Sequence, residues 1–372
     1  MKLLYLIAGT YRAAGMEKVL ADKANWLAAH GYDIVIATTD QRGQAPAFAM
    51  DPAIKQVDLG IDYEVTNGAN FLKKAAAFPL KKWKHRRRLT KLLMTEKPDI
   101  TVSMFCNDAG FLPKIKDGSK KVLEVHFSRF KRLQYGRKGL WRMADKLLSD
   151  RDLQYTRAFD RFVVLTAEDK GYWGDLPNMV VIPNGVARKH PVPLEAHTVI
   201  AVGRYSFQKA LDRLVTAWSK IEDRGDWKLR LVGDGECREE LFALVNELGL
   251  VDSVELTGVQ KDMEAVYDNA SILALSSRYE GLPMVLLEAQ AYGIPAVSFA
   301  CQCGPKDVIV DGVSGRLVRE GDVEGLARAL DELIHDPETI RKMGAAAWDA
   351  AERWEPETIM QQWDNLFKGL CR

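Results

Sequence analysis

The sequence predicts an α/β protein made of two doubly wound, parallel-sheet domains that face each other across a cleft. Its 372 residues exceed what one ordinary hydrophobic core needs, and 47% of them are apolar. Short apolar runs alternate along the chain with amphipathic segments, which is typical of parallel sheets covered by helices on both faces. A proline-rich stretch at residues 180–197 separates two such series.

The first series predicts a domain over residues 1–185. Its apolar runs predict strands at residues 2–9, 32–40, 99–105, 120–127 and 161–167. Apolar residues recur at helical spacing over residues 15–31, where Gly31 is a typical stop signal, so this segment predicts a helix. The N-terminal run is interpreted as a buried strand and not as a signal peptide, because no small-residue cleavage site follows it.

The second series predicts a domain over residues 186–355, followed by a C-terminal helix over residues 356–372. Apolar runs predict strands at residues 197–204, 227–235, 253–258, 271–277 and 294–299. Amphipathic segments predict helices at residues 211–221, 238–250, 263–270, 283–293 and 322–336.

Charge divides the chain unevenly, although its formal net charge is only +1. Residues 1–185 hold 31 Lys and Arg against 20 Asp and Glu, while residues 186–372 hold 21 against 31. The basic stretches 71–93 and 128–142 carry aromatic residues, including Phe78 and Trp83. Each fits a solvated helix face, a surface that binds an anionic membrane, or one that binds a phosphate-bearing acceptor. No nucleic-acid partner is predicted, because no recognised nucleic-acid motif is present.

Cysteine usage and hydropathy exclude several classes of protein. No apolar run is long enough to predict a membrane-spanning helix. Five cysteines argue against a disulfide framework and for a reducing, cytoplasmic compartment. No Cys or His residues lie at zinc spacing, so no metal site is predicted.

Candidate ligand-binding residues follow the predicted strands, because ligands bind at the carboxyl ends of strands in such sheets. Gly15 precedes the first helix, where a plain turn is the alternative, and His126 ends the fourth strand, where a lone histidine is more often structural. Arg204 and Lys209 flank the loop after residues 197–204. An arginine and a lysine at this spacing suit a diphosphate, and two surface cations are the alternative.

The segment RYEGLPMVLLEA, residues 278–289, gives the sharpest signal. Glu280 precedes a turn, Pro283 is expected in the first turn of the helix, and Glu288 is expected one turn later. Backbone N–H groups after Gly281 would be free to bind sugar or phosphate oxygens. The two carboxylates suit the hydroxyl groups of a nucleotide sugar.

This segment, E-G-L-P-x4-E, resembles the E-x7-E motif of glycosyltransferase family 4, whose members have two Rossmann-like domains, the GT-B fold. The resemblance covers nearly the whole chain. CQCGPKDVI at residues 301–309 is similar to bacterial members that build capsule, exopolysaccharide and O-antigen. Further similar segments are IPNGV (182–186), VGR (202–204), LVGDG (231–235), LTG (256–258) and residues 311–318.

The resemblance implies a retaining, metal-independent transfer of a hexose from a nucleotide sugar, most often a UDP-sugar, without a cofactor. Arg204 and Lys209 would neutralise the diphosphate, and Glu280 would orient the donor sugar. Glu288 would bind the ribose. Further contacts to the nucleotide sugar are implied for His126 and Gly15, for Val259 beside the base, and for the backbone of Gly281, Leu282, Pro283, Met284 and Val285.

The resemblance also implies partners. The acceptor would be a glycan or a polyprenyl-diphosphate-linked saccharide, and the basic first domain would bind the inner face of the cell membrane peripherally. The last helix would cross back to the first domain. Two other functions stay open: a UDP-sugar epimerase of the same fold and a non-catalytic protein that binds nucleotide sugars or lipids. An NAD-dependent dehydrogenase is disfavoured because G-x-G-x-x-G is absent.

Overall fold

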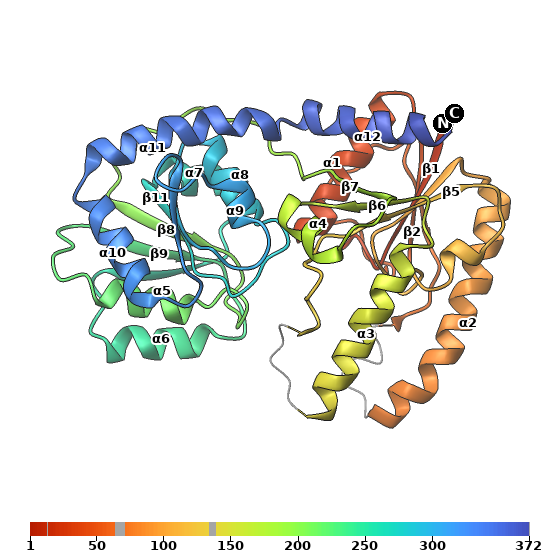
Figure 1. Cartoon of the computed structure of the whole chain (residues 1–372), viewed down its shortest axis with the longest axis horizontal. Coiled ribbons are helices and arrows are strands. Elements are labelled where there is room, and N and C mark those ends of the chain that lie inside the picture. The colour runs from red at the N-terminus through yellow and green to blue at the C-terminus, as the bar shows by residue number, and fades with distance from the viewer. Residues whose placement is uncertain (13, 64–70, 134–138, 372) are drawn as a thin grey trace. The chain divides into compact units, whose positions relative to one another are not determined.

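The computed structural model of the chain describes residues 1–12, 14–63, 71–133 and 139–371 (Figure 1). They form two compact units, each built on one parallel sheet. Unit 1 contains Met1–Leu165, Lys170–Ile182 and Met360–Arg372, and unit 2 contains Thr166–Asp169 and Pro183–Ile359. Two doubly wound domains are thus confirmed, while the cleft between them stays a prediction.

Unit 1 holds a seven-stranded sheet in the order β3-β2-β1-β4-β5-β6-β7, with every pairing parallel. The strands are β1 (Lys2–Ile7), β2 (Asp33–Thr38), β3 (Lys55–Asp58), β4 (Ile100–Ser103), β5 (Lys120–Glu124), β6 (Arg161–Val164) and β7 (Met179–Val181). All five predicted strands are present. The sequence indicated neither β3 nor β7, because the edge strand β3, KQVD, is mostly polar and exposed and β7, MVV, is only three residues long.

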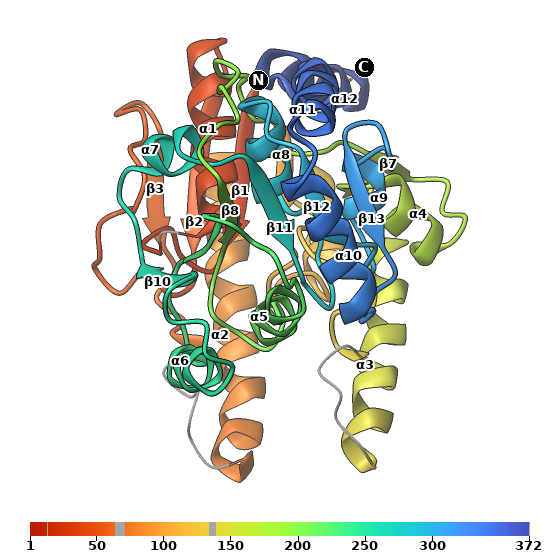
Figure 2. The ribbon, with the colours of Figure 1, turned by 90° about the vertical axis from the view of Figure 1, so that its left-hand side faces the viewer.

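Helices cover the sheet of unit 1. They are α1 (Gly15–Ala29), α2 (Phe71–Glu96), the short η2 (Leu112–Lys114), α3 (Leu140–Thr156), α4 (Ala167–Trp173) and most of α12 (Pro356–Leu370). In both views α2 and α3 extend well beyond the end of the sheet (Figures 1 and 2). The basic stretch 71–93 thus lies on a helix, and residues 134–138 of the second basic stretch lie outside the described residues.

Unit 2 holds a six-stranded parallel sheet in the order β10-β9-β8-β11-β12-β13. Its strands are β8 (Thr198–Val202), β9 (Lys228–Val232), β10 (Val254–Gly258), β11 (Ile272–Leu275), β12 (Ala296–Phe299) and β13 (Gly315–Val318). Its helices are α5 (Leu211–Ser219), α6 (Arg238–Glu247), α7 (Met263–Asp268), α8 (Met284–Ala291), α9 (Pro305–Val308), α10 (Val323–Ile334), α11 (Pro337–Ala350) and η4 (Ala351–Trp354). All predicted elements of this half are present.

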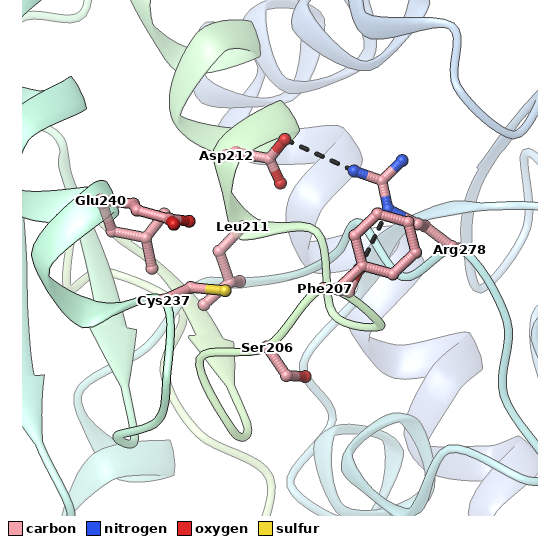
Figure 3. A pocket seen from close by; sticks show the side chains of 8 residues that line it. Ser206, Phe207, Leu211, Asp212, Cys237, Glu240 and Arg278 are labelled. Atoms are coloured by element: carbon pink, nitrogen blue, oxygen red, sulfur yellow. Dashed lines mark hydrogen bonds and ion pairs between the residues drawn. The ribbon is translucent and has the colours of Figure 1, made fainter. Parts of the chain in front are cut away.

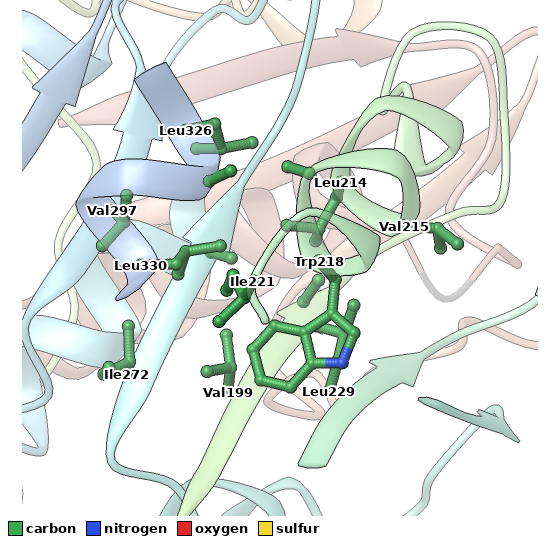
Figure 4. Packing of buried hydrophobic residues seen from close by; sticks show 14 of the residues in the cluster. Val199, Leu214, Val215, Trp218, Ile221, Leu229, Ile272, Val297, Leu326 and Leu330 are labelled. Carbon is green, nitrogen blue, oxygen red and sulfur yellow. The ribbon is translucent and has the colours of Figure 1, made fainter. Parts of the chain in front are cut away.

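The core of unit 2 lies between its sheet and helices α5 and α10 (Figure 4). Trp218 of α5 is fully buried there, and its indole N–H donates to Ser253 Oγ at 3.3 Å. Leu326 and Leu330 of α10 and Val297 of β12 belong to the same cluster. This packing fixes one face of β8 and β11, so the loops that leave these strands start from rigid positions.

Across the described residues, no helix combines the length and the apolar character that crossing a membrane requires.

Candidate functional site

The site of unit 2 lies where the strand order of its sheet reverses. β8 is paired with β9 on one side and with β11 on the other (Figure 1). The loops after β8 and β11 therefore leave the sheet at its topological switch point, where open α/β sheets bind their ligands. These loops, residues 203–210 and 276–283, carry Arg204, Lys209 and Glu280.

Lys209 and Glu280 meet across this edge. Lys209 Nζ lies 2.8 Å from Glu280 Oε1, which also accepts a hydrogen bond from Ser277 Oγ at 2.6 Å. The Glu280 side chain is 8% exposed and the Lys209 side chain 18%. An ion pair so little exposed is held in one geometry, because breaking it would leave a poorly hydrated charge.

The two loops are tied to each other by further contacts. Arg278 Nε donates to the Phe207 carbonyl at 3.0 Å, and its guanidinium lies 4.2 Å from the centre of the Phe207 ring (Figure 3). Gln208 Nε2 donates to the Tyr279 carbonyl at 3.0 Å. A pocket of about 140 Å³ beside Phe207 and Arg278 is smaller than a typical ligand site of roughly 300–1,000 Å³. We therefore interpret this region as support for the loops.

Glycine brings a third loop against the β8 loop. Gly233, in the LVGDG segment after β9, has φ +140°, and a Cβ there would lie 2.0 Å from the Gly203 carbonyl oxygen. Gly203 itself has φ +150°. Only glycine permits this approach. The glycines of the VGR and LVGDG segments are therefore required by the close packing of two backbone segments beside Arg204.

The N-terminus of α8 completes the site. No described residue accepts a hydrogen bond from the backbone N–H groups of Met284 or Val285. Such groups, at the positive end of the helix dipole, attract anions and hydroxyl oxygens. Pro283 caps the helix and does not lie in its first turn as predicted, since α8 begins at Met284. Its extended backbone, with ψ 100°, explains the later start.

Glu288 lies one turn along α8 from Met284. Its Oε2 accepts a hydrogen bond from the Tyr267 hydroxyl at 2.5 Å. Tyr267 stacks on Tyr292, with ring centres 5.0 Å apart. Burial and the Glu288 carboxylate both raise the pKa of Tyr267, so the tyrosine stays a hydrogen-bond donor. Glu288 is half-buried.

In unit 2, Arg204 and Val259 are the exposed members of the predicted set. Arg204 has no ion pair among the described residues, and Val259 is 75% exposed at the end of the edge strand β10. Gly281 and Leu282 lie in the turn between Glu280 and α8, where the Leu282 side chain is buried.

His126 and Gly15 belong to unit 1. The His126 side chain is 7% exposed, and its Nε2 lies 2.9 Å from Glu124 Oε1. The same oxygen accepts a hydrogen bond from Lys23 Nζ at 2.5 Å. Burial alone would raise the pKa of Glu124, but Lys23 and His126 outweigh it and lower the pKa to about 2. Gly15 begins α1 on the surface, next to open space.

Sequence reasoning missed three residues that hold the predicted ones in position: Ser277, Tyr267 and Glu124. A signal for Glu124 existed, because a carboxylate within an apolar central strand needs a partner. No sequence signal pointed to Tyr267, since its contact joins two separate helices.

Comparisons with known proteins agree with this arrangement. A family model described as Glycosyltransferase Family 4 matches residues 13–190, and one described as Glycosyl transferases group 1 matches residues 186–349. The amylovoran biosynthesis glycosyltransferase AmsD of Erwinia amylovora is 34% identical over 219 residues, which make up 56% of this chain and 62% of AmsD. The match thus spans less than two thirds of AmsD.

Two further similarities extend over the whole chain. An uncharacterized glycosyltransferase of Haemophilus influenzae is 29% identical over 375 residues, covering 98% of this chain and 99% of that protein. Sucrose-phosphate synthase of Thermosynechococcus elongatus aligns with a TM-score of 0.83 and 19% identity, over 99% of this chain and 98% of that structure. At this identity the structural likeness shows the fold.

Proposed function

The chain belongs to the glycosyltransferases, as a family 4 domain followed by a group 1 domain, and from this premise we propose that it transfers a hexose from a UDP-sugar to an acceptor hydroxyl with retention of configuration. The acceptor is a glycan or a lipid-linked saccharide of a bacterial surface polysaccharide. The name of AmsD, a biosynthetic glycosyltransferase for amylovoran, supports this setting.

One observation carries the proposal: Lys209, Glu280 and the N-terminus of α8 come together where the sheet of unit 2 reverses its strand order. The leaving group of the reaction is a diphosphate that gains charge as the glycosidic bond breaks. Lys209, the exposed Arg204 and the free N–H groups of α8 supply positive charge and hydrogen-bond donors for it. Stabilisation that grows with the developing charge lowers the barrier of the transfer.

The carboxylates recognise the sugars of the donor. Glu280 Oε1 is held by Lys209 and Ser277, which fixes the direction of its carboxylate toward the turn before α8. It orients hydroxyl groups of the transferred hexose. Glu288, held by Tyr267, binds the ribose hydroxyls. Val259 contacts the base. From unit 1, His126 touches the sugar near the reacting carbon, and Gly15 adjoins the diphosphate.

Retention follows from a front-side displacement. The acceptor hydroxyl approaches from the side of the leaving diphosphate, and a phosphate oxygen takes its proton, so no side-chain nucleophile is required. In this proposal Arg204, Lys209 and the α8 amides neutralise the diphosphate without a metal ion, and no cofactor takes part. Cytoplasmic UDP-sugars supply the donor, and a basic face of unit 1 holds the protein at the inner surface of the membrane.

The test is a screen for UDP release across a panel of UDP-sugars, with a pool of lipid-linked acceptors. We expect Arg204→Ala and Glu280→Ala each to lower kcat/KM by about 100-fold, since each removes a group that stabilises the transition state. Arg341→Ala changes an exposed arginine of unit 2 for which no ion pair is recorded, and it should leave the rate unchanged. EDTA should also leave the rate unchanged.

Product analysis separates this activity from its alternatives. NMR of the product should give the same anomeric configuration as the donor. If the UDP-sugar changes into another UDP-sugar without any acceptor, the protein is an epimerase. Wild-type rates in both variants would remove the assignment of the site, and binding of UDP-sugar without UDP release would contradict an enzyme.

A further inference from the structure

The strand order of the sheet in unit 1 also reverses at one point. β1 is paired with β2 on one side and with β4 on the other. A cavity of about 320 Å³ opens at the carboxyl ends of these strands, and its wall includes Ala8 after β1 and, after β4, Phe105, Cys106, Asn107, Ala109 and Gly110. Its volume lies within the range of small-molecule sites, roughly 300–1,000 Å³.

The cavity is strongly cationic. Helices α2 and α3 and the loop after β5 contribute four positive side chains against one carboxylate: Lys82, Lys131, Arg132, Arg151 and Asp152. Asp152 is already engaged, because its Oδ2 lies 2.7 Å from Arg132 Nε. Lys82, Lys131 and Arg151 have no ion pair among the described residues. Three cations from separate elements therefore converge without an anion of the protein to balance them.

The pKa shifts of the two cavity lysines are consistent with this excess of positive charge. Partial burial lowers the pKa of Lys82, and the neighbouring charges of Arg151 and Lys114 lower it further. Partial burial and Arg132 lower the pKa of Lys131 in the same way. An anion bound between these side chains would relieve their repulsion and stabilise their charged forms.

Aromatic side chains form the other wall. The rings of Phe105 and Phe127 meet edge to face with centres 5.1 Å apart, and Lys131 Nζ lies 4.3 Å from the centre of the Phe127 ring. Tyr155 of α3 and Phe78 of α2 also line the cavity. A ligand that fits must therefore carry an anionic group next to a body with apolar faces, as a sugar ring has.

We propose that this cavity binds the phosphate group of a phosphorylated saccharide, with the sugar ring against Phe105 and Phe127. A phosphate ester, with a charge of about −1.5 to −2 at neutral pH, matches the net charge of +3 of the lining better than a single carboxylate does. The inference rests on the proposed function, in which this saccharide is the acceptor, and it defines the acceptor class as phosphate-bearing.

The test measures binding to the full chain by calorimetry, with UDP present at saturation to occupy any nucleotide site. The probes are N-acetylglucosamine 1-phosphate, glucose 1-phosphate and the uncharged methyl glucoside. We expect the two sugar phosphates to bind and methyl glucoside not to bind. The double variant Lys131→Gln/Arg151→Gln should weaken binding of the phosphates by at least about tenfold, because it removes two of the charged donors for the phosphate.

A matched control changes one lysine and one arginine of unit 1 that do not line the cavity. Lys91 of α2 and Arg157, which follows α3, are exposed and outside the cavity. Lys91→Gln/Arg157→Gln should bind the sugar phosphates as the wild type does. An unchanged circular dichroism spectrum of the cavity variant would show that it is folded. An unchanged affinity for UDP would show that the proposed donor site is intact.

A second arm identifies the source of the phosphate, using a short-chain polyprenyl-diphosphate sugar in detergent. Binding of this compound alone, lost in the cavity variant, assigns the site to a lipid-linked diphosphate. Equal affinity of wild type and cavity variant for every phosphate, or no binding of any, overturns the proposal. Neither result affects the release of UDP at unit 2, so the proposed function is judged separately.

Discussion

At the scale of single residues, the predicted functional side chains are held by charged or hydrogen-bonding partners. Glu280 is fixed by Lys209 and Ser277, and Glu288 by Tyr267. His126 is held against Glu124, whose pKa is kept low by Lys23. In each case a buried or half-buried carboxylate takes one direction, because its partners leave it no equally stable alternative.

Glu124→Gln tests this arrangement in unit 1. Both members of the Lys23–Glu124 pair are buried, with side chains 4% and 1% exposed, so the change leaves Lys23 without its counter-charge. We expect the free energy of unfolding to fall by about 3–5 kcal/mol, measured by urea denaturation. Asp22→Asn removes the exposed Lys18–Asp22 pair and should cost less than about 1 kcal/mol.

The outcome for activity separates a positioning role from a purely structural one. If Glu124 positions His126 for the donor sugar, Glu124→Gln should raise KM for the UDP-sugar at temperatures where the variant stays folded. An unchanged KM together with the loss of stability would make the pair structural only.

At the scale of elements, helix α2 has one side that is hydrogen-bonded to the rest of unit 1 and another side that is exposed. Lys81 Nζ donates to the Asp62 carbonyl at 2.5 Å, and Lys84 Nζ donates to that of Gly60 at 2.9 Å. Arg88 also donates to the carbonyls of residues 59 and 60. These cations therefore anchor α2 to the chain after β3.

The exposed side of α2 carries both apolar and cationic side chains. Leu80 and Trp83 are 68% and 58% exposed, and the Arg87 guanidinium lies 5.5 Å from the centre of the Trp83 ring. By helical spacing these three residues share a face. A mixture of tryptophan, leucine and arginine on a surface helix suits the interface of an anionic membrane.

We therefore predict salt-sensitive binding of the protein to vesicles that contain an anionic lipid. Neutralising Lys81, Lys82, Arg86, Arg87 and Arg88 should weaken it, and so should neutralising Arg86 and Arg87 alone, which neither anchor α2 nor line the cavity. Leu80→Ser/Trp83→Ser should weaken it without changing the charge. Flotation of vesicles with and without phosphatidylserine measures both effects. Phe242→Ser, at a residue of α6 that is 60% exposed, is the control for lost apolar surface. Binding that is the same for all variants rejects this interface.

At the scale of the whole molecule, the chain passes between the units four times, after residues 165, 169, 182 and 359. The short return at Thr166–Asp169 is held in unit 2, because Asp307 Oδ1 accepts a hydrogen bond from the Ala167 N–H at 2.8 Å. The last passage lies within α12. Its C-terminal part packs on unit 1. There Lys23 Nζ lies 3.7 Å from the centre of the Trp363 ring, and Asp364 Oδ1 accepts a hydrogen bond from the Tyr32 hydroxyl at 2.5 Å.

Removing residues 360–372 should therefore destabilise unit 1 far more than unit 2. Trp363 and Phe367, which are nearly fully buried, would be lost from unit 1. Hydrogen exchange should accelerate in β1, β2 and β5 and stay unchanged in β8, β9 and β11. Equal acceleration in both units would contradict this assignment of α12.

The sequence by itself determined most strands of the two sheets and the loop and helix that carry Glu280 and Glu288. Apolar runs with helical segments between them specify buried parallel strands, and a Gly-x-Pro turn with flanking glutamates specifies a loop, a helix start and two carboxylates. These are local signals. The edge strand β3 and the helix α3 were missed because their residues are largely polar, so their pairing and burial depend on neighbours far away in the chain.

Only the tertiary structure decided which groups meet. Lys209 lies 71 residues from Glu280, and Lys23 lies 101 residues from Glu124. The cationic cavity of unit 1 combines side chains from α2, α3 and the loop after β5. Such contacts have no periodicity along the chain, because the order of the strands in the sheet, and not the spacing in the sequence, sets which loops become neighbours.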